Sequence, residues 1–285
     1  MAETSPKGFD PVIQEYYHRT PEEARLKQGP FELEEVRTRE LIQRFAPPPP
    51  ATVLDVGGAA GAYALWLAEA GYAVHLIEPV ARLLAEAQRR SAAAPRQLAS
   101  CRIGDARALD LPDSTADVIL LLGPLYHLTD AQDRARSLRE AARVLKLGGW
   151  LFAAAISRWA SALDGLARDL LQDPRFTLIV EQDLRDGQHR NPTDRLDYFT
   201  TAYFHRPEEL ADEVQTAGLA LNGVYGLEGP GWILSDVAER MAHAQRRAAL
   251  LDVARMLETA PAGLGSSAHL LAVARRPGGT SRAVA

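Results

Sequence analysis

The stretch that most constrains the fold is residues 53–61, which read Val-Leu-Asp-Val-Gly-Gly-Ala-Ala-Gly. An apolar run ends in an acid, a glycine-rich turn follows at once, and an alanine-rich helical pattern begins near Tyr63. This pattern predicts a strand, a tight turn and a helix whose N-terminus faces whatever occupies the turn. Because glycines leave the backbone amides of such a turn open to a ligand, the stretch predicts a site for a nucleoside-containing cofactor.

The strand and helix patterns go on alternating after this turn. Six further strand patterns lie at residues 73–78, 98–103, 116–122, 150–156, 219–227 and 268–274. Nearly continuous apolar strands with amphipathic helices between them indicate a parallel sheet that is buried on both faces. We therefore expect an α/β fold with a doubly wound, seven-stranded, mostly parallel sheet. Ligands of such sheets bind at the carboxyl ends of the strands.

The pattern also divides the chain into segments. The polar stretch at 186–195 is too long for a simple connection and indicates a lid or a mobile loop. A second expectation is one long helix over residues 233–259. The expected division is an N-terminal helical cap at 1–46, a cofactor-binding core at 47–160, a lid or substrate insertion at 161–205, a C-terminal part of the same α/β domain at 206–276 and a tail at 277–285.

Composition and charge narrow the function classes. The 285 residues carry a formal net charge of −5, which does not favour a nucleic-acid partner. The single cysteine, Cys101, excludes an intrachain disulfide and a cysteine-based zinc site, and the histidines lack metal-like spacing, so we expect no metal. No apolar run approaches the roughly 20 residues that cross a membrane. Without a signal-peptide pattern, the expected location is cytoplasmic.

Five short motifs lie within these strands or directly next to them. They occupy residues 54–61, 78, 104–106, 117–120 and 143–149. In this order and at these spacings they resemble the motifs of class I S-adenosylmethionine-dependent methyltransferases, strongly over residues 50–160 and in layout over the whole chain. The Gly-Pro-Leu-Tyr-His and Glu-Gly-Pro-Gly-Trp motifs, at 123–127 and 228–232, further resemble a bacterial small-molecule branch of that family. The resemblance implies a Rossmann-like methyltransferase fold, S-adenosylmethionine as cofactor and methyl transfer to a small-molecule acceptor.

The resemblance also implies a set of cofactor-binding residues. Asp55 would orient the loop near the methionyl amino group, the two oxygens of Glu78 suit the two ribose hydroxyls, and Asp105 would accept a hydrogen bond from the adenine amino group. The full expected set lies at the strand ends and in the cap, and comprises Asp55, Gly57, Gly58, Gly61, Glu78, Asp105, Ala106, Gly123 and Tyr17.

One position of the loop departs from the pattern of the family. That pattern reads acid-x-Gly-x-Gly-x-Gly, and Ala59 stands where its middle glycine is expected. A methyl group at this position matters only if the residue needs a positive φ. We therefore expect Ala59 to be the one residue of the loop that opposes cofactor binding.

The catalytic candidates follow from where the resemblance places the reacting methyl group, beside Gly123. Tyr126 and His127 come directly after it and would lie close to the chemistry. A histidine is the side chain most readily tuned to accept a proton near neutral pH, so His127 is the candidate base. The alternative is that His127 only packs beneath the cofactor.

Substrate contacts are expected from the cap and the insertion. Arg25 lies in the cap, where it could meet a polar group of the acceptor. His189 and Arg190 lie in the polar stretch, and a guanidinium fork matches a carboxylate. A solvated loop is the alternative for this pair.

Other functions also fit parts of the sequence. Glu78 lies about 20 residues beyond the loop, as the ribose-binding acid of an NAD(P)-dependent oxidoreductase does. That alternative leaves Asp105 and the fifth-strand motif unexplained. A nucleic-acid methyltransferase and a non-catalytic regulator with a cofactor fold are the remaining alternatives. We expect no nucleic-acid or membrane partner, and the sequence is compatible with a homodimer.

Overall fold

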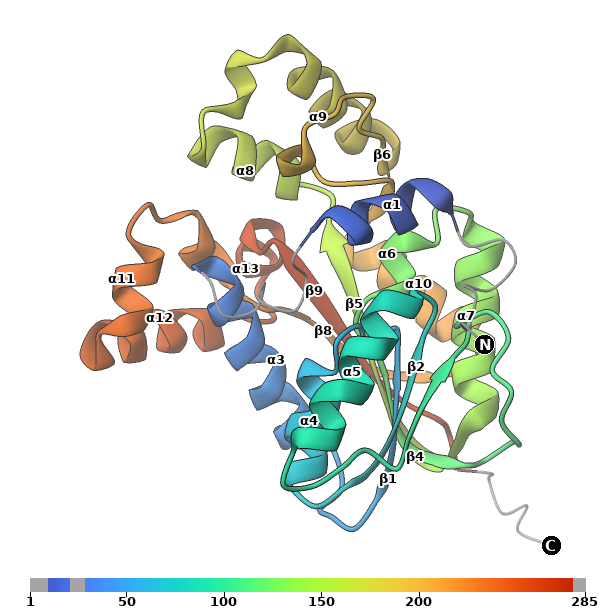
Figure 1. The fold of residues 1–285 in the computed structure, drawn as a ribbon. Coiled ribbons are helices and arrows are strands. Elements are labelled where there is room, and N and C mark those ends of the chain that lie inside the picture. The colour runs from blue at the N-terminus through green and yellow to red at the C-terminus, as the bar shows by residue number, and fades with distance from the viewer. Residues whose placement is uncertain (1–9, 21–28, 279–285) are drawn as a thin grey trace, which may run out of the picture.

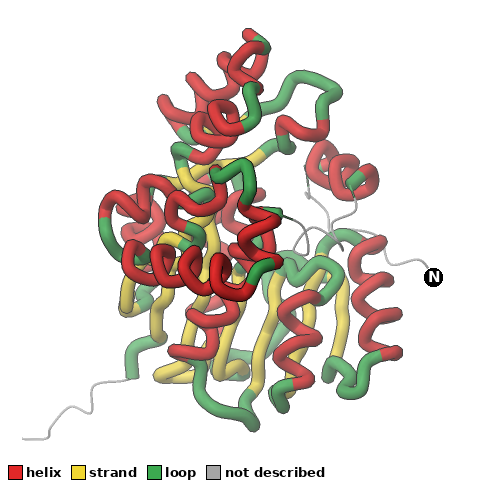
Figure 2. The backbone as a smooth tube through the Cα atoms, turned by 90° about the vertical axis from the view of Figure 1, so that its left-hand side faces the viewer, coloured by secondary structure: helices red, strands yellow, loops and turns green. Residues whose placement is uncertain are grey.

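The structure, a computed structural model, describes residues 10–20 and 29–278. A central sheet carries helices on both faces, with further helices above one end of the strands (Figures 1 and 2). This architecture confirms the expected α/β class. Arg25, the expected substrate contact of the cap, lies outside the described residues.

The core of the sheet has seven strands in the order β3-β2-β1-β4-β5-β9-β8. All neighbouring pairs from β3 to β5 are parallel, whereas β9 runs antiparallel to both β5 and β8. The expected mostly parallel sheet is thus confirmed with its seven core strands, and two short strands described below extend it to nine within the described residues. The core strands are β1 (Thr52–Val56), β2 (Ala73–Glu78), β3 (Ser100–Ile103), β4 (Ala116–Leu121), β5 (Leu145–Ser157), β8 (Ala220–Gly226) and β9 (His269–Arg275).

The helices lie between the strands or in the segments that cover the strand ends. They are α1 (Pro11–Arg19), α3 (Pro30–Phe45), α4 (Ala62–Glu69), α5 (Ala81–Ala93), α6 (Pro124–His127), α7 (Ala131–Val144), α8 (Ala160–Ala167), α9 (Pro174–Asp186), α10 (Pro207–Thr216), α11 (Val237–Ala242), α12 (Ala244–Leu257) and α13 (Pro261–Ser266). Short 3₁₀ turns are η1 (Leu170–Gln172), η2 (Leu196–Tyr198) and η3 (Gly229–Ile233).

The two faces of the sheet form two separate cores because successive strand residues point to opposite sides. Leu54 and Ile119 pack with residues of α7 and α10 on one face. Val53 and Val118, their neighbours in sequence, pack with residues of α3, α4 and α5 on the other face. Burial on both faces explains why these strands read as continuous apolar runs.

Strand register brings the motifs to one edge of the sheet. Asp55 pairs with Leu76 on β2 and with Leu120 on β4. Glu78, the last residue of β2, pairs with Ile103, the last residue of β3. The turns that follow these strands therefore lie side by side at their carboxyl ends, where the sequence predicts the ligand.

The insertion (residues 161–205) is attached through an extension of β5. This strand has 13 residues, and beyond its register with β4 it pairs with β7 (Ala202–His205) at Ile156 and Ser157. The short strand β6 (Gln188–His189) adds to β7. In Figure 1 the insertion stands above the sheet, with α1 between it and the strand ends.

The expected single helix over 233–259 is wrong. The segment contains α11 and α12, which are separated at His243, and η3 precedes them. The apolar residues of both helices pack with Leu33 of α3 in a small core of their own, so the break follows from packing two short helices on one neighbour. None of the described helices has the length and apolar character to cross a membrane.

Candidate active site

The glycine-rich turn closes tightly around its own backbone. Gly57 has φ +71°, and a Cβ there would stand 2.9 Å from the Pro124 side chain. A Cβ on Gly58 would stand 2.7 Å from Oδ2 of Asp55. Gly61 has φ +79° and precedes the first residue of α4. A side chain at Gly57 or Gly58 would clash within the turn, and the positive φ of Gly57 and Gly61 favours glycine, so the sequence needs glycine at these positions.

Ala59 does have the positive φ at which its methyl group matters. Its φ is +47°, in the left-handed region, where an alanine costs roughly 1–2 kcal/mol. Its backbone N–H donates a 2.8 Å hydrogen bond to Oε2 of Glu78. The turn therefore keeps its shape with a strained alanine, and Glu78 fixes that residue from the neighbouring strand.

Glu78 is 3% exposed, and its carboxylate accepts hydrogen bonds from two backbone segments. Its Oε2 accepts the Ala59 N–H, and its Oε1 accepts the Val80 N–H at 2.8 Å. These two bonds hold the carboxylate between the glycine-rich turn and the start of α5. The geometry is compatible with the expected ribose contact, since Glu78 also lines the cavity described below.

Asp55 is the most perturbed acid of the site. It is 1% exposed, and its Oδ2 has no hydrogen-bond partner among the described residues. Burial raises the pKa of Asp55 to about 7, although a backbone hydrogen bond from Ala64 acts in the opposite direction. A buried carboxylate oxygen without a donor, beside a glycine cradle, suits a cationic amino group such as that of a methionyl moiety.

Asp105 lies in a turn after β3, and its carboxylate forms an ion pair with an arginine. Arg107 donates to both of its oxygens and also pairs with Asp133 at 2.8 Å. The hydrogen bonds that the Arg107 guanidinium donates to Asp105, and secondly to Asp133, raise the pKa of the guanidinium. The adenine contact of Asp105 therefore stays a prediction, and Arg107 is a cavity residue that sequence reasoning missed.

The short helix α6 carries the two catalytic candidates. The Tyr126 hydroxyl donates to the Leu122 carbonyl at 3.2 Å, which holds it on the backbone of its own turn. His127 Nε2 lies 2.6 Å from the hydroxyl oxygen of Tyr17, a residue 110 positions earlier in the chain. The structure thus brings together a histidine and a tyrosine that the sequence placed in separate roles.

Helix α1 reaches this position because α5 holds its C-terminal end. Arg82 donates to the carbonyl of Tyr17 at 2.6 Å and to that of Thr20 at 3.1 Å. Asp10 caps the N-terminal end through the Val12 N–H at 2.8 Å. Arg82 gives no sequence signal for this role, because an arginine on an amphipathic helix is ordinarily a surface residue.

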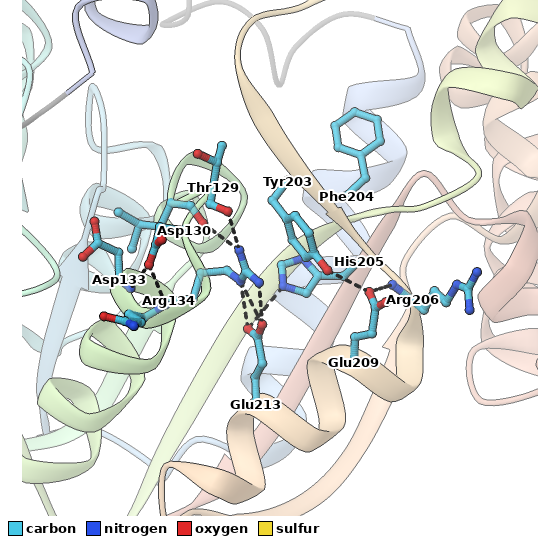
Figure 3. Close-up of polar contacts among 12 residues, drawn as sticks. Thr129, Asp130, Asp133, Arg134, Tyr203, Phe204, His205, Arg206, Glu209 and Glu213 are labelled. Carbon is cyan, nitrogen blue, oxygen red and sulfur yellow. Dashed lines mark hydrogen bonds and ion pairs between the residues drawn. The ribbon is translucent and has the colours of Figure 1, made fainter. Parts of the chain in front are cut away.

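A buried charge cluster supports the wall next to His127 (Figure 3). Arg134 is 3% exposed and donates to the carbonyls of Leu128 and Thr129 at 3.0 and 3.1 Å. Its guanidinium also pairs with Glu213, which His205 contacts from the other side at 3.3 Å. Burial alone would raise the pKa of Glu213, but hydrogen bonds from His205 and Arg134 outweigh it and hold that pKa below its usual value.

Two expected substrate contacts lie elsewhere. His189 is 1% exposed and bonds to Asp183 at 2.8 Å and to the Tyr198 carbonyl at 2.8 Å. Arg190 donates to the carbonyls of His189 and Ala202. Within the described part of the chain, neither residue lines the cavity. Their side chains hold the insertion together, so the geometry gives no support to the expected carboxylate clamp.

The Glu-Gly-Pro-Gly-Trp motif also has a structural role, in a region outside the cavity. Glu228, at 2% exposed, bonds to Nδ1 of His269 at 2.6 Å, and Glu34 lies 3.7 Å from the same nitrogen. A Cβ on Gly231 would stand 2.7 Å from Leu250, so the motif packs closely on α12. Trp232 Nε1 donates to the Ser266 carbonyl. This motif ties η3 to α3, α13 and β9.

A cavity of about 700 Å³ unites the strand ends with α1 and α6. Its volume is typical of small-molecule sites. Of the expected cofactor set, all but Gly61 line it. The expected site residues in its wall are Tyr17, Asp55, Gly57, Gly58, Glu78, Asp105, Ala106, Gly123, Tyr126 and His127.

Comparison with known proteins agrees with the family resemblance of the sequence motifs. Residues 54–153 match the family described as "Methyltransferase domain". The ubiquinone/menaquinone biosynthesis C-methyltransferase UbiE of Acidiphilium cryptum is 34% identical over 193 residues, which cover 67% of this chain and 75% of that protein.

Two solved structures share the fold. A SAM-dependent methyltransferase of Methanosarcina mazei has a TM-score of 0.56 at 18% identity, with 84% of this chain and 97% of that chain covered. A second one, from Mesorhizobium loti, has a TM-score of 0.57 at 17% identity, with 86% and 100% covered.

The fold, the cavity and these relatives define the class of the protein. The chain belongs to the class I S-adenosylmethionine-dependent methyltransferases. It is a methyltransferase, and S-adenosylmethionine is its cofactor. This assignment replaces the oxidoreductase alternative that Glu78 left open.

Proposed function

We propose that this enzyme methylates a small-molecule acceptor, which binds between α1, α6 and the cofactor. The observation that carries the proposal is the Tyr17–His127 hydrogen bond in the wall of the cavity, near Gly123, which follows the end of β4. The cap (1–46) and the insertion (161–205) would shape the acceptor side, whereas the core (47–160) would hold the cofactor. The named site residues and this division of the chain are part of the proposal.

The cofactor end of the proposed site consists of groups that match polar parts of the cofactor. Asp55 would face its amino group, Glu78 its ribose, and the N–H of Ala106 its adenine. The turn at 57–61 presents backbone amides and no side chains longer than a methyl group. When bound, S-adenosylmethionine supplies a sulfonium methyl group, and the thioether that departs is neutral and needs no acid.

At the acceptor end, this chain has to align a nucleophile, exclude water and remove a proton where the nucleophile carries one. His127 is the group that can take this proton, because an imidazole titrates near neutral pH. The Tyr17 hydroxyl holds the His127 ring in place through Nε2, and Tyr17 lines the cavity from α1. Tyr126 contributes its ring to the wall, since its hydroxyl already bonds to the backbone.

Several observations favour a small molecule over a nucleic acid. The chain has a net charge of −5, and Asp10, Asp130 and Asp133 stand at the cavity. Four arginines of the described chain line the same cavity, and one of them, Arg107, pairs with Asp133, so the argument rests on the net charge of the chain, which does not favour a polyanion. The name of the Acidiphilium relative describes C-methylation in quinone biosynthesis, which is compatible with a small acceptor of the bacterial branch. The cytoplasmic location stays a prediction, and a homodimer stays compatible with the sequence.

Methyl transfer to a defined panel tests the proposal. The purified enzyme would be incubated with methyl-labelled S-adenosylmethionine and separate pools of phenols, quinols, amines, thiols, transfer RNA and unfolded protein. S-adenosylhomocysteine and labelled products would be measured by mass spectrometry. We expect turnover with one small-molecule pool only. Label that enters RNA or protein instead would contradict the proposal.

A further inference from the structure

Phe199, in the insertion, has a backbone conformation that normally requires glycine. Its φ is +65° and its ψ is −172°, in a region that is essentially restricted to glycine. Three other non-glycine residues in the described chain have positive φ, namely Ala59, Ser114 and Asp169, but none of them carries an aromatic ring. A strained conformation of this kind persists only where the surrounding structure imposes it, and such positions cluster at functional sites.

Hydrogen bonds within the insertion impose this conformation. The Asn191 side-chain amide donates to the Phe199 carbonyl at 2.8 Å and to the Arg195 carbonyl at 2.8 Å. The Phe199 N–H donates to the Leu196 carbonyl at 3.2 Å. The backbone on both sides of the Phe199 ring is therefore held from the same loop.

The strained backbone directs the ring toward the proposed acceptor side. The ring lies edge-to-face on Tyr16 of α1, with centroids 5.4 Å apart, and 6.0 Å from the ring of His127. Tyr16 in turn lies 5.5 Å from Tyr17, the partner of His127. The four rings form a closed circuit of contacts among α1, α6 and the insertion, with Phe199 as the insertion's member.

We propose that Phe199 is a positioning residue, which holds the Tyr17–His127 pair in its bonded geometry by docking the insertion onto α1. The proposal rests on the proposed function, in which this pair faces the acceptor. Phe199 itself does not line the cavity in the described chain, so it would act through Tyr16 and His127. The strain at residue 199 then has a use, because a relaxed backbone would turn the ring away from both.

The test compares four variants in complex with S-adenosylhomocysteine. Phe199→Ala removes the ring and keeps a Cβ, Phe199→Gly removes both, and Phe199→Tyr keeps an aromatic ring. Asp169→Gly is the matched control, because it relieves a positive φ at an exposed position of the same insertion. The readouts are the nitrogen-15 signals of the His127 ring, which follow its tautomer and its hydrogen bond to Tyr17 and respond little to the loss of a neighbouring ring current, together with the melting temperature and the affinity for S-adenosylhomocysteine. The His127 signals are assigned with His127→Gln.

We expect the His127 ring signals to shift in Phe199→Ala and Phe199→Gly, to return in Phe199→Tyr and to be unchanged in Asp169→Gly. The affinity for S-adenosylhomocysteine should stay within about twofold. Because glycine relieves the strain, Phe199→Gly should melt about 2–4 °C above Phe199→Ala, the reverse of the usual order. With an acceptor in hand, kcat of Phe199→Ala should fall about tenfold to a hundredfold, with little change in KM for S-adenosylmethionine.

Unchanged His127 signals in a folded Phe199→Ala protein would overturn the proposal, as would a melting temperature of Phe199→Gly below that of Phe199→Ala. Asn191→Ala provides a second route, since it keeps the ring and removes its clamp; it should shift the same signals. If His127→Gln keeps full kcat, the proposed base fails, while the NMR comparison still decides whether Phe199 positions the His127 ring.

Discussion

The two ends of the cavity are built in different ways. The cofactor end is made by turns that directly follow β1, β2 and β3, and its key contacts join such a turn to the neighbouring strand, as Ala59 to Glu78. The acceptor end is made by side chains from α1, α6 and the insertion, and its key contact joins Tyr17 with His127 across 110 positions. One end is thus fixed by the sheet, and the other by helices that dock on it.

This difference has a functional consequence. Sites on a rigid sheet are positioned more firmly than sites on docked segments. We therefore expect changes at the acceptor end to alter turnover while cofactor affinity is kept, and changes at the cofactor end to alter affinity directly. The predictions below separate the two ends, from the largest expected effect to the smallest.

The largest effect is expected for His127→Gln. If His127 is the base, kcat should fall by about 10²–10⁴-fold, while the affinity for S-adenosylhomocysteine changes little. Steady-state kinetics and calorimetry measure the two quantities. The matched control is His243→Gln, at an exposed position at the start of α12. A loss of less than about tenfold in His127→Gln would argue against general-base catalysis.

A smaller effect, on the affinity for S-adenosylhomocysteine instead of kcat, is expected for Glu78→Gln. Its amide would face one of two N–H donors, from Ala59 or Val80, and would lose the charge that faces the ribose. Hydrogen bonds to charged groups contribute about 1.5–3 kcal/mol, so affinity for S-adenosylhomocysteine should weaken about tenfold to a hundredfold. The exposed Glu239→Gln on α11 is the control. Equal affinities in both variants would contradict the cofactor-end assignment.

The pH dependence of stability tests Asp55. Its pKa is about 7 in the folded protein and near its ordinary value of 3.8 in the unfolded chain. Between these two pH values the folded state holds one more proton than the unfolded state. The stabilisation that protonated Asp55 contributes is therefore fully present below about pH 4 and is lost as the pH rises through 7. The loss is up to about 1.4 kcal/mol per pH unit.

Urea unfolding of the cofactor-free protein measures this loss. The stability of the wild type relative to Asp55→Asn should fall between pH 5 and 7 and level off above that range. If the stabilities of the two proteins change in parallel from pH 5 to 8, Asp55 is ionised throughout. This result would contradict the conclusion that burial raises the pKa of Asp55.

The smallest effect is expected for Ala59→Gly. Glycine relieves a left-handed alanine, which costs roughly 1–2 kcal/mol, but it also raises the entropy of the unfolded chain by about 0.5–1 kcal/mol. The net gain in the free energy of unfolding should be about 0.5–1 kcal/mol, measured by urea denaturation. A destabilised variant would show that the turn does not strain Ala59.

The same comparison explains how much the sequence could predict. Asp55, Glu78 and the glycine turn could be placed because strand ends of a parallel sheet meet at one edge, whatever the details of packing. The missing glycine marked Ala59 as the position where a positive φ would matter, and the structure gives it a φ of +47°. The sheet with its seven core strands was predictable for the same reason, since each strand carries its own apolar pattern.

The acceptor end could not be read in the same way. Tyr17 was assigned to the cofactor and Tyr126 to catalysis, but the structure pairs Tyr17 with His127 and turns the Tyr126 hydroxyl onto the backbone. Arg82 and Phe199 carried no local signal, because their contacts depend on how separate segments dock. His189 read as a solvated or binding residue, whereas burial against Asp183 makes it part of the insertion's interior.

The most direct test of the central claim is a calorimetric titration of the purified protein with S-adenosylhomocysteine, with NADH titrated in parallel. We predict saturable one-to-one binding of S-adenosylhomocysteine and no heat with NADH, and we predict that His127→Gln binds as the wild type does. No binding of S-adenosylhomocysteine between pH 6 and 8, or saturable binding of NADH in its place, would contradict the assignment of this cavity.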